Sequence, residues 1–197
     1  MRCNQAQRDE LKEHQFTPEQ GYETCCVKYM LWFRSPYEKD WKQIPNPPCE
    51  NPISVVGISV STADVVTATN KMFRYFDWAG WERLPDSVLS SGGAMNKDVW
   101  MIGVDNKLYR WKYNENINSY IDGYWIQQPG NDPVQVAAYN ETRVVMRNGA
   151  GEIFAWKNNN WVKVAFNGPA SSIAIGVYNI YAVNKNTGQA FLTSFYP

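Results

Sequence analysis

The sequence predicts an all-β fold built of repeated short sheets, and three observations point to it. Aromatic residues make up 15% of the 197 residues, with 9 Trp, 12 Tyr and 8 Phe. Val (17) and Asn (19) are abundant while Leu (6) is scarce, a composition typical of strands joined by turns. The third observation is an internal repeat of about 40 residues, which sets the order of the expected strands. The length suits one sizeable domain or two small ones.

Each repeat opens with a Trp, at Trp41, Trp81, Trp125 and Trp161, so the intervals are 40, 44 and 36 residues. Pro follows at the fourth position in three copies (Pro45, Pro85, Pro129), and Ala165 takes its place in the last. Three further strand-like stretches follow each Trp: an inner one (53–55, 87–89, 134–136, 173–175), a second one (64–68, 98–102, 143–146, 179–183) and an aromatic third one (72–75, 108–111, 153–156, 190–193). Asn, Asp and Gly separate the second and third stretches, as tight hairpins require.

Four short strands per repeat cannot bury their apolar faces alone, and radial stacking of the sheets solves this. The prediction is therefore a β-propeller of four-stranded antiparallel blades. Five aromatic third strands, near Phe33, Phe73, Tyr109, Phe154 and Phe191, favour five blades, with four blades and an N-terminal extension as the alternative. The last sheet lacks a Trp-led fourth strand. We expect the propeller to span residues 25–197. Residues 1–24 would form an arm that is helical over 4–16 or completes a terminal blade.

The order of these motifs resembles the tectonin repeat, and the best copy is residues 98–111 (DVWMIGVDNKLYRW). The resemblance implies a β-propeller and, for many members, a lectin of innate defence; other members are protein-interaction modules. Three positions depart from the pattern: Ala155 and Leu192 replace the Arg seen at Arg74 and Arg110, and Ala165 replaces Pro.

Charge and composition exclude several function classes. Lys+Arg (19) balance Asp+Glu (19), which argues against a nucleic-acid partner or an anionic membrane surface. No apolar run is long enough for a transmembrane segment. His14 is the one histidine and no carboxylate pair stands out, so we expect no enzyme, no cofactor and no metal site.

The residues favour carbohydrate binding, because sugars need an aromatic plate beside amide or Arg groups. We expect the four repeat-initial Trp residues to pack between blades. Trp111 and Trp156, nearer the blade rim, are then the exposed candidates. Arg74 and Arg110 either face a ligand or stack between blades, and Asn106 and Asn148 are ligand candidates or turn formers. Repeated weak clefts would bind glycoconjugates multivalently. The alternative is a structural or protein-interaction propeller that assembles through its N-terminal arm and edge blades, with homo-oligomers expected.

Two kinds of covalent modification are predicted. Cys3, Cys25, Cys26 and Cys49 are disulfide candidates, with unpaired thiols as the alternative. Asn140 opens the Asn140-Glu141-Thr142 glycosylation sequon. An extracellular location, as a mature or non-classically exported chain, is slightly favoured over a cytoplasmic one. The identity of the sugar stays open.

Overall fold

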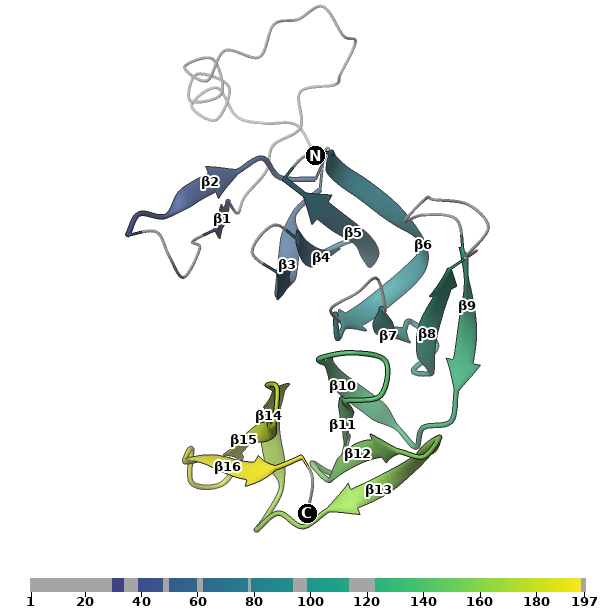
Figure 1. Ribbon diagram of the computed structural model, residues 1–197, viewed down its shortest axis with the longest axis vertical. Coiled ribbons are helices and arrows are strands. Elements are labelled where there is room, and N and C mark those ends of the chain that lie inside the picture. Colours follow the sequence, from purple (N-terminus) through teal and green to yellow (C-terminus); the bar gives the residue numbers. More distant parts are fainter. Residues whose placement is uncertain are drawn as a thin grey trace, which may run out of the picture. The chain divides into compact units, whose positions relative to one another are not determined.

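The computed structural model describes residues 30–33, 39–47, 50–59, 62–77, 79–93, 99–113 and 123–195, and every regular element among them is a β-strand (Figure 1). The predicted N-terminal arm and its helix over 4–16 lie outside these residues, as do the four cysteines. The chain divides into two compact units, one of Met1–Ile53 with Thr67–Thr69, the other of Ser54–Val66 with Asn70–Pro197.

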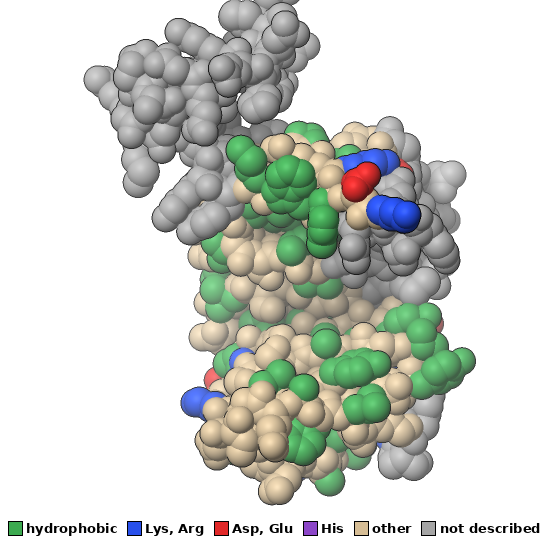
Figure 2. Space-filling view, turned by 90° about the vertical axis from the view of Figure 1, so that its left-hand side faces the viewer, with side chains coloured by type: hydrophobic (Ala, Val, Ile, Leu, Met, Phe, Trp, Pro, Cys, Tyr) green, Lys and Arg blue, Asp and Glu red, His purple; other side chains and the backbone are tan. Residues whose placement is uncertain are grey.

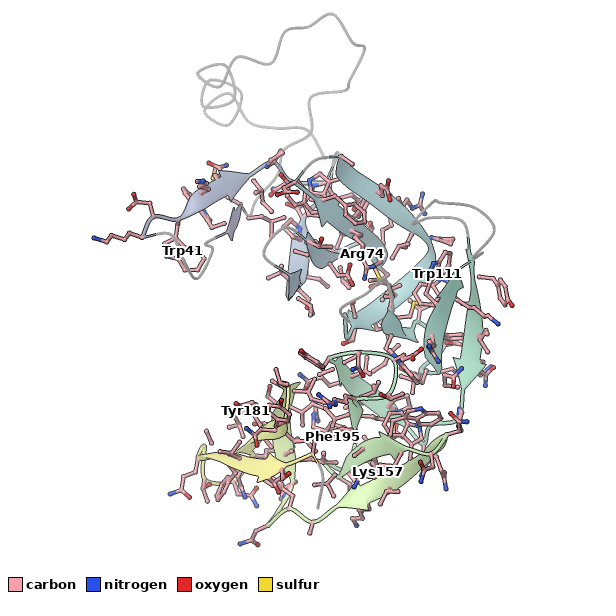
Figure 3. All side chains as sticks on the ribbon, viewed as in Figure 1. Trp41, Arg74, Trp111, Lys157, Tyr181 and Phe195 are labelled. Atoms are coloured by element: carbon pink, nitrogen blue, oxygen red, sulfur yellow. The ribbon has the colours of Figure 1, made fainter. Side chains whose placement is uncertain are left out.

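The first unit contains the antiparallel pair β1 (Leu31–Phe33) and β2 (Lys42–Ile44). Its register, with Trp32 opposite Gln43, corresponds to Phe73 opposite Arg83 in the next repeat. The pair therefore matches the third and fourth strands of a blade. Trp41, just before β2, is 60% exposed (Figure 3), and its packing between blades stays a prediction.

The second unit contains four successive sheets, which we call blades 1 to 4. Blade 1 comprises β3 (Pro52–Ser59), which starts in the first unit, β4 (Thr62–Thr67), β5 (Lys71–Phe76) and the first half of β6 (Gly80–Ser91). Blade 2 comprises the second half of β6, β7 (Trp100–Gly103), β8 (Leu108–Tyr113) and β9 (Gly123–Gln128). Blade 3 comprises β10 (Pro133–Ala138), β11 (Val144–Asn148), β12 (Ile153–Lys157) and β13 (Asn160–Val164). Blade 4 has the three described strands β14 (Ala170–Ile175), β15 (Asn179–Asn184) and β16 (Ala190–Ser194). All pairings whose register is resolved are antiparallel, and the five predicted aromatic third strands are β1, β5, β8, β12 and β16.

The hairpins between second and third strands confirm the predicted turn chemistry. Asn70 (φ 61°) and Asn106 (φ 59°) both adopt left-handed backbone conformations. Asn tolerates this conformation better than other residues with a side chain because its short amide bonds locally. Gly151 (φ 82°) occupies the corresponding turn of blade 3, where an added Cβ would lie 2.9 Å from the Ala170 nitrogen. The turn thus brings the start of blade 4 against blade 3.

Apolar clusters bury the faces between consecutive blades. Met72 and Leu84 of blade 1 pack with Met101 and Trp111 of blade 2. The next two clusters have the same character and join blade 2 to blade 3 (Trp100, Ile102, Leu108, Val136, Val144, Met146, Trp156) and blade 3 to blade 4 (Val145, Ile153, Ala155, Ala170, Ile173, Ile180, Ala182, Phe195). Blades 2 and 3 therefore bury apolar side chains on both faces.

Two repeat-initial Trp residues, Trp125 and Trp161, connect neighbouring blades, as predicted. Trp125 Nε1 donates to the Pro85 carbonyl at 3.0 Å, and Trp161 Nε1 donates to the Pro129 carbonyl at 2.6 Å. The acceptor in each case is the Pro four residues after the preceding repeat's Trp. Trp81 packs on Phe73 and Tyr75 of its own blade. The recurring motif of Trp, two variable residues, an apolar residue and Pro thus has a structural cause. The Pro carbonyl accepts a hydrogen bond from the indole of the next blade.

Candidate functional site

The two tryptophans predicted to be exposed are buried. Trp111 is 1% and Trp156 is 7% exposed (Figure 3). Trp111 packs edge-on against Trp125, with ring centroids 4.8 Å apart, and Trp156 lies 4.9 Å from Trp161. The predicted exposure is wrong, because the end of the third strand lies under the fourth strand's Trp. A ligand role for these indoles stays a prediction, and it would require a change in this packing.

Arg74 is buried and forms a bidentate ion pair within blade 1. Its Nε and Nη2 donate to the two Asp64 carboxylate oxygens at 2.7 and 3.0 Å. Ser91 Oγ of blade 2 reaches the same carboxylate at 3.3 Å. This burial gives Arg74 a structural partner in its own blade, and both stacking between blades and a ligand-facing role stay predictions.

Arg110 stands at the equivalent position of blade 2 but is partly exposed. Its Nη2 donates to Glu141 Oε2 at 2.8 Å, and Glu141 lies in the β10–β11 turn of blade 3. Both side chains contact solvent, so this is a surface ion pair across a blade junction. A ligand carboxylate would have to compete with Glu141 for the guanidinium.

The predicted Asn residues act in turns. Asn106 is exposed with its positive φ. Asn148 is buried: its Nδ2 donates to Glu152 Oε2 at 2.8 Å while its Oδ1 accepts the Glu152 amide at 2.9 Å. Lys163 bonds the same carboxylate, and these two partners, Lys163 first, lower the pKa of Glu152. Asn140, the sequon residue, caps its own turn by accepting from Thr142 and Arg143.

One surface, on blade 4, was not predicted from the sequence. It is found by comparing equivalent strand positions in the four blades. In each blade the second and third strands place a pair of side chains toward the following blade: Asp64 with Arg74, Trp100 with Arg110, Val145 with Ala155, and Tyr181 with Leu192. The second-strand members of the first three pairs are fully buried. In blade 4, Tyr181 (labelled in Figure 3) is 46% exposed and Leu192 is 61% exposed. These two apolar side chains are therefore exposed at positions that correspond to inter-blade contacts in the preceding blades.

The surroundings of Tyr181 and Leu192 are weakly polar and almost uncharged. Ala174 lies opposite Tyr181 on β14, and Val183 opposite Ala190 is next along the strands. We call these five residues the blade 4 face. Lys185, in the β15–β16 turn, is the one charged residue from 165 to 197. In Figure 2, at the height of blade 4, hydrophobic side chains lie among uncharged atoms and charged ones lie toward the margin. Depletion of charge is typical of the core of a protein interface.

The edge strand β16 adjoins this face. It is the last strand of a three-stranded sheet, where blade 3 has a fourth strand paired to its third. Phe195 donates its amide to the Tyr178 carbonyl, and the Asn184 amide bonds the Gln189 carbonyl. Because antiparallel bonding alternates, the backbone groups of 191 and 193 face β15 while those of Ala190 and Leu192 face the open edge.

An aromatic and cationic cluster lies at the junction of blades 3 and 4. The Arg143 guanidinium lies 5.7 Å from the ring centroids of both Tyr139 and Tyr178. Arg143 Nη1 also donates to the Val177 carbonyl at 2.7 Å. Tyr178 remains largely exposed. The cluster places an open aromatic ring beside a cation.

Other kinds of site were sought among the described residues. No group of three or more His, Cys, Asp or Glu side chains there could hold a metal ion. None of the described residues forms a helix long and apolar enough to cross a membrane. Asp105 and Tyr109 line an open pocket, where the Tyr109 hydroxyl bond at 2.7 Å lowers the pKa of Asp105.

Comparison with solved structures shows the fold. Human WBSCR16 matches with a TM-score of 0.58 at 12% identity, over 79% of this chain and 50% of that chain. Yeast RCC1 (Prp20), solved with Kap60, matches with a TM-score of 0.57 at 12% identity, over 78% and 46%. YCF48 bound to a D1 peptide matches with a TM-score of 0.51 at 13% identity, over 83% and 56%. The chain therefore spans about half the length of these structures.

These neighbours are β-propellers, so the predicted all-β propeller fold is confirmed. No family model matches the sequence, and no curated protein matches it. Membership of the tectonin family accordingly stays a prediction.

Proposed function

We propose that this chain is a non-enzymatic protein-interaction propeller that assembles through the blade 4 face. One observation carries the proposal: Tyr181 and Leu192 are exposed, whereas the preceding blades bury all three side chains equivalent to Tyr181. Burial of such apolar surface is the main driving force of protein association. The occupant to which we commit is a second copy of this chain.

The character of the surface supports this reading. The blade 4 face continues the series of inter-blade interfaces, so it already has the shape and polarity that pack against another sheet. The near absence of charge lowers the cost of desolvation on binding. Yeast Prp20 and YCF48, two similar propellers, were solved in complexes with Kap60 and with a D1 peptide. Those partners belong to those proteins, but they show that propellers of this kind present protein-binding surfaces.

Sedimentation velocity of the full chain from about 1 to 100 µM, the range of transient interfaces, tests the proposal. We expect concentration-dependent self-association that Tyr181→Ser or Leu192→Ser weakens at least about tenfold, the equivalent of roughly 1.4 kcal/mol. Tyr124→Ser is the matched control, because Tyr124 on β9 is also an exposed Tyr on a strand. The proposal would be contradicted if the wild-type chain stays monomeric at every concentration. It would also be contradicted if all three variants weaken self-association equally.

A second candidate function is glycan binding, and the Tyr178 cluster favours it. An exposed aromatic ring beside the Arg143 guanidinium offers a sugar both an apolar plate and a hydrogen-bond donor. Glycan-array binding by the wild-type chain that Tyr178→Ala removes would support this function. An array without binding at high protein concentration would sink it, and self-association unaffected by free sugars would favour assembly.

A further inference from the structure

We propose that Asn167, which Gly168 follows in the connection between β13 and β14, is a site of spontaneous deamidation. Asn is one of the residue types that limit the chemical lifetime of proteins. A following Gly favours the reaction, because it has no Cβ to obstruct the approach of its backbone nitrogen to the Asn side chain. This modification does not depend on the proposed assembly.

The chain contains Asn followed by Gly twice, and the other copy, Asn148 with Gly149, is held in place. Asn148 is 5% exposed, and the oxygen and the nitrogen of its side-chain amide both bond to Glu152. The Gly149 nitrogen, which would have to attack, donates to the Asp132 carbonyl at 3.1 Å and to Asp132 Oδ2 at 3.2 Å. Asn148 can therefore react only in molecules in which this turn has opened.

Asn167 and Gly168, by contrast, are both exposed. The hydrogen bond that Asn167 forms uses its backbone carbonyl, which accepts from Asn184 Nδ2 at 2.5 Å. Among the described residues, none bonds to the Asn167 side chain or to the Gly168 amide. Gly168 has a φ of 91°, a left-handed conformation that Gly adopts without steric cost. Water therefore reaches both reacting groups in the folded chain.

The reaction balances without an oxidant or a reductant. A hydroxide ion of the solvent removes the Gly168 amide proton, and the nitrogen attacks Asn167 Cγ. The bond from this nitrogen to Cγ forms, the Cγ–Nδ2 bond breaks, and Nδ2 leaves as ammonia with a proton from water. The resulting five-membered succinimide then adds one water molecule. Hydrolysis at Cγ gives Asp, and hydrolysis at the backbone carbonyl carbon gives isoaspartate, in which the chain runs through Cβ and Cγ.

The isoaspartate product changes the contact that this connection makes with blade 4. Asn184 is buried, and its Oδ1 accepts the amides of Asn186 and Thr187 while its Nδ2 bonds the Asn167 carbonyl. Isoaspartate converts that carbonyl into a free carboxylate and adds one methylene to the chain between β13 and β14. We therefore expect the isoaspartate form to be less stable than the Asp form.

The experiment incubates the full chain in mildly alkaline buffer, folded and in concentrated urea, and follows both sites by peptide mapping with mass spectrometry. In the folded chain Asn167 should deamidate at least about tenfold faster than Asn148, because Asn148 first requires local opening. In urea the two sites should react at similar rates, since the difference arises from the fold. Asn167→Gln keeps an amide but lengthens the side chain, so it should suppress the reaction here, with Asn148 as the internal control. Asn167→Asp, which has the charge but not the extra methylene, should melt at a higher temperature than the separated isoaspartate form.

Fast reaction of Asn167 and slow reaction of Asn148 in the folded chain, with similar rates in urea, support the proposal. Equal rates at the two sites in the folded chain, or reaction of Asn167 in urea alone, overturn it. A difference of the same size that persists in urea also overturns it, because the flanking sequence and not the fold would then be the cause. An isoaspartate form that melts like Asn167→Asp supports deamidation but overturns the expected loss of the Asn184 contact.

Discussion

Replacement of Arg74 by Met should destabilise the protein strongly, because it strands a buried charge. Asp64 and Arg74 are almost completely buried and joined by two hydrogen bonds of 2.7 and 3.0 Å. Met keeps much of the side-chain volume but removes both guanidinium bonds from the Asp64 carboxylate, which retains the longer Ser91 bond of 3.3 Å. Removing one member of a buried ion pair costs about 3–5 kcal/mol.

The assay is urea-induced unfolding, read as the midpoint and slope, together with thermal melting. For a chain of this size the loss corresponds to a fall in melting temperature of roughly 6–20 °C. The double variant Asp64→Leu/Arg74→Met should recover much of the loss, because an apolar pair needs no compensating charge. If Arg74→Met costs less than about 1 kcal/mol, or the double variant is worse than the single one, the pair is not a buried structural element. A ligand-facing role for Arg74 would then regain support.

Three other predictions follow from the same contacts. Arg110→Met should cost no more than about 1 kcal/mol by urea unfolding, because its bond to Glu141 is a surface ion pair; a loss equal to that of Arg74→Met would contradict this. Trp161→Phe should lose about 0.5–1.5 kcal/mol for the missing bond to the Pro129 carbonyl, beyond any change in packing; full retention of stability would show that the bond is not formed. Because the folded-state pKa of Glu152 lies below its ordinary 4.5, its stabilisation is present above that pH and is lost as the pH falls through the lowered value. Melting temperatures of Glu152→Gln should consequently fall less steeply on acidification than those of the wild type, and parallel curves would refute the assignment.

The blade architecture could be predicted because each blade repeats the same residue types at the same strand and turn positions. A Trp at the start of the fourth strand and Asn at the second hairpin recur in the sequence, and the structure uses them for the Nε1–carbonyl bonds and the positive φ at Asn70 and Asn106. These features depend on neighbours a few residues away or one repeat away. Because the same residues recur in each repeat, both features could be predicted from the sequence alone.

Exposure could not be predicted in the same way. In a blade covered on both faces, alternation does not say which side chains reach solvent, so Trp111 was expected at the rim and lies under Trp125. The partner of Arg74, Asp64, lies ten residues away across a hairpin and is identified by the strand register.

The exposed side chains of blade 4 had one signal in the sequence, namely that Lys185 is the one charged residue from 165 to 197. Whether Tyr181 is buried, however, depends on what lies beyond the repeat that carries it. Its exposure of 46% is therefore known only from the three-dimensional structure.

Hydrogen exchange of individual backbone amides in the dilute chain tests most directly the claim on which the proposed assembly depends, that blade 4 is uncovered in the free chain. The account predicts that the amides of Ala190 and Leu192 exchange at least about tenfold faster than those of Ile153 and Ala155, their equivalents in blade 3, which pair with β13. Equal protection of all four amides in the dilute chain alone would contradict the account, because it would mean that the edge of β16 is already paired.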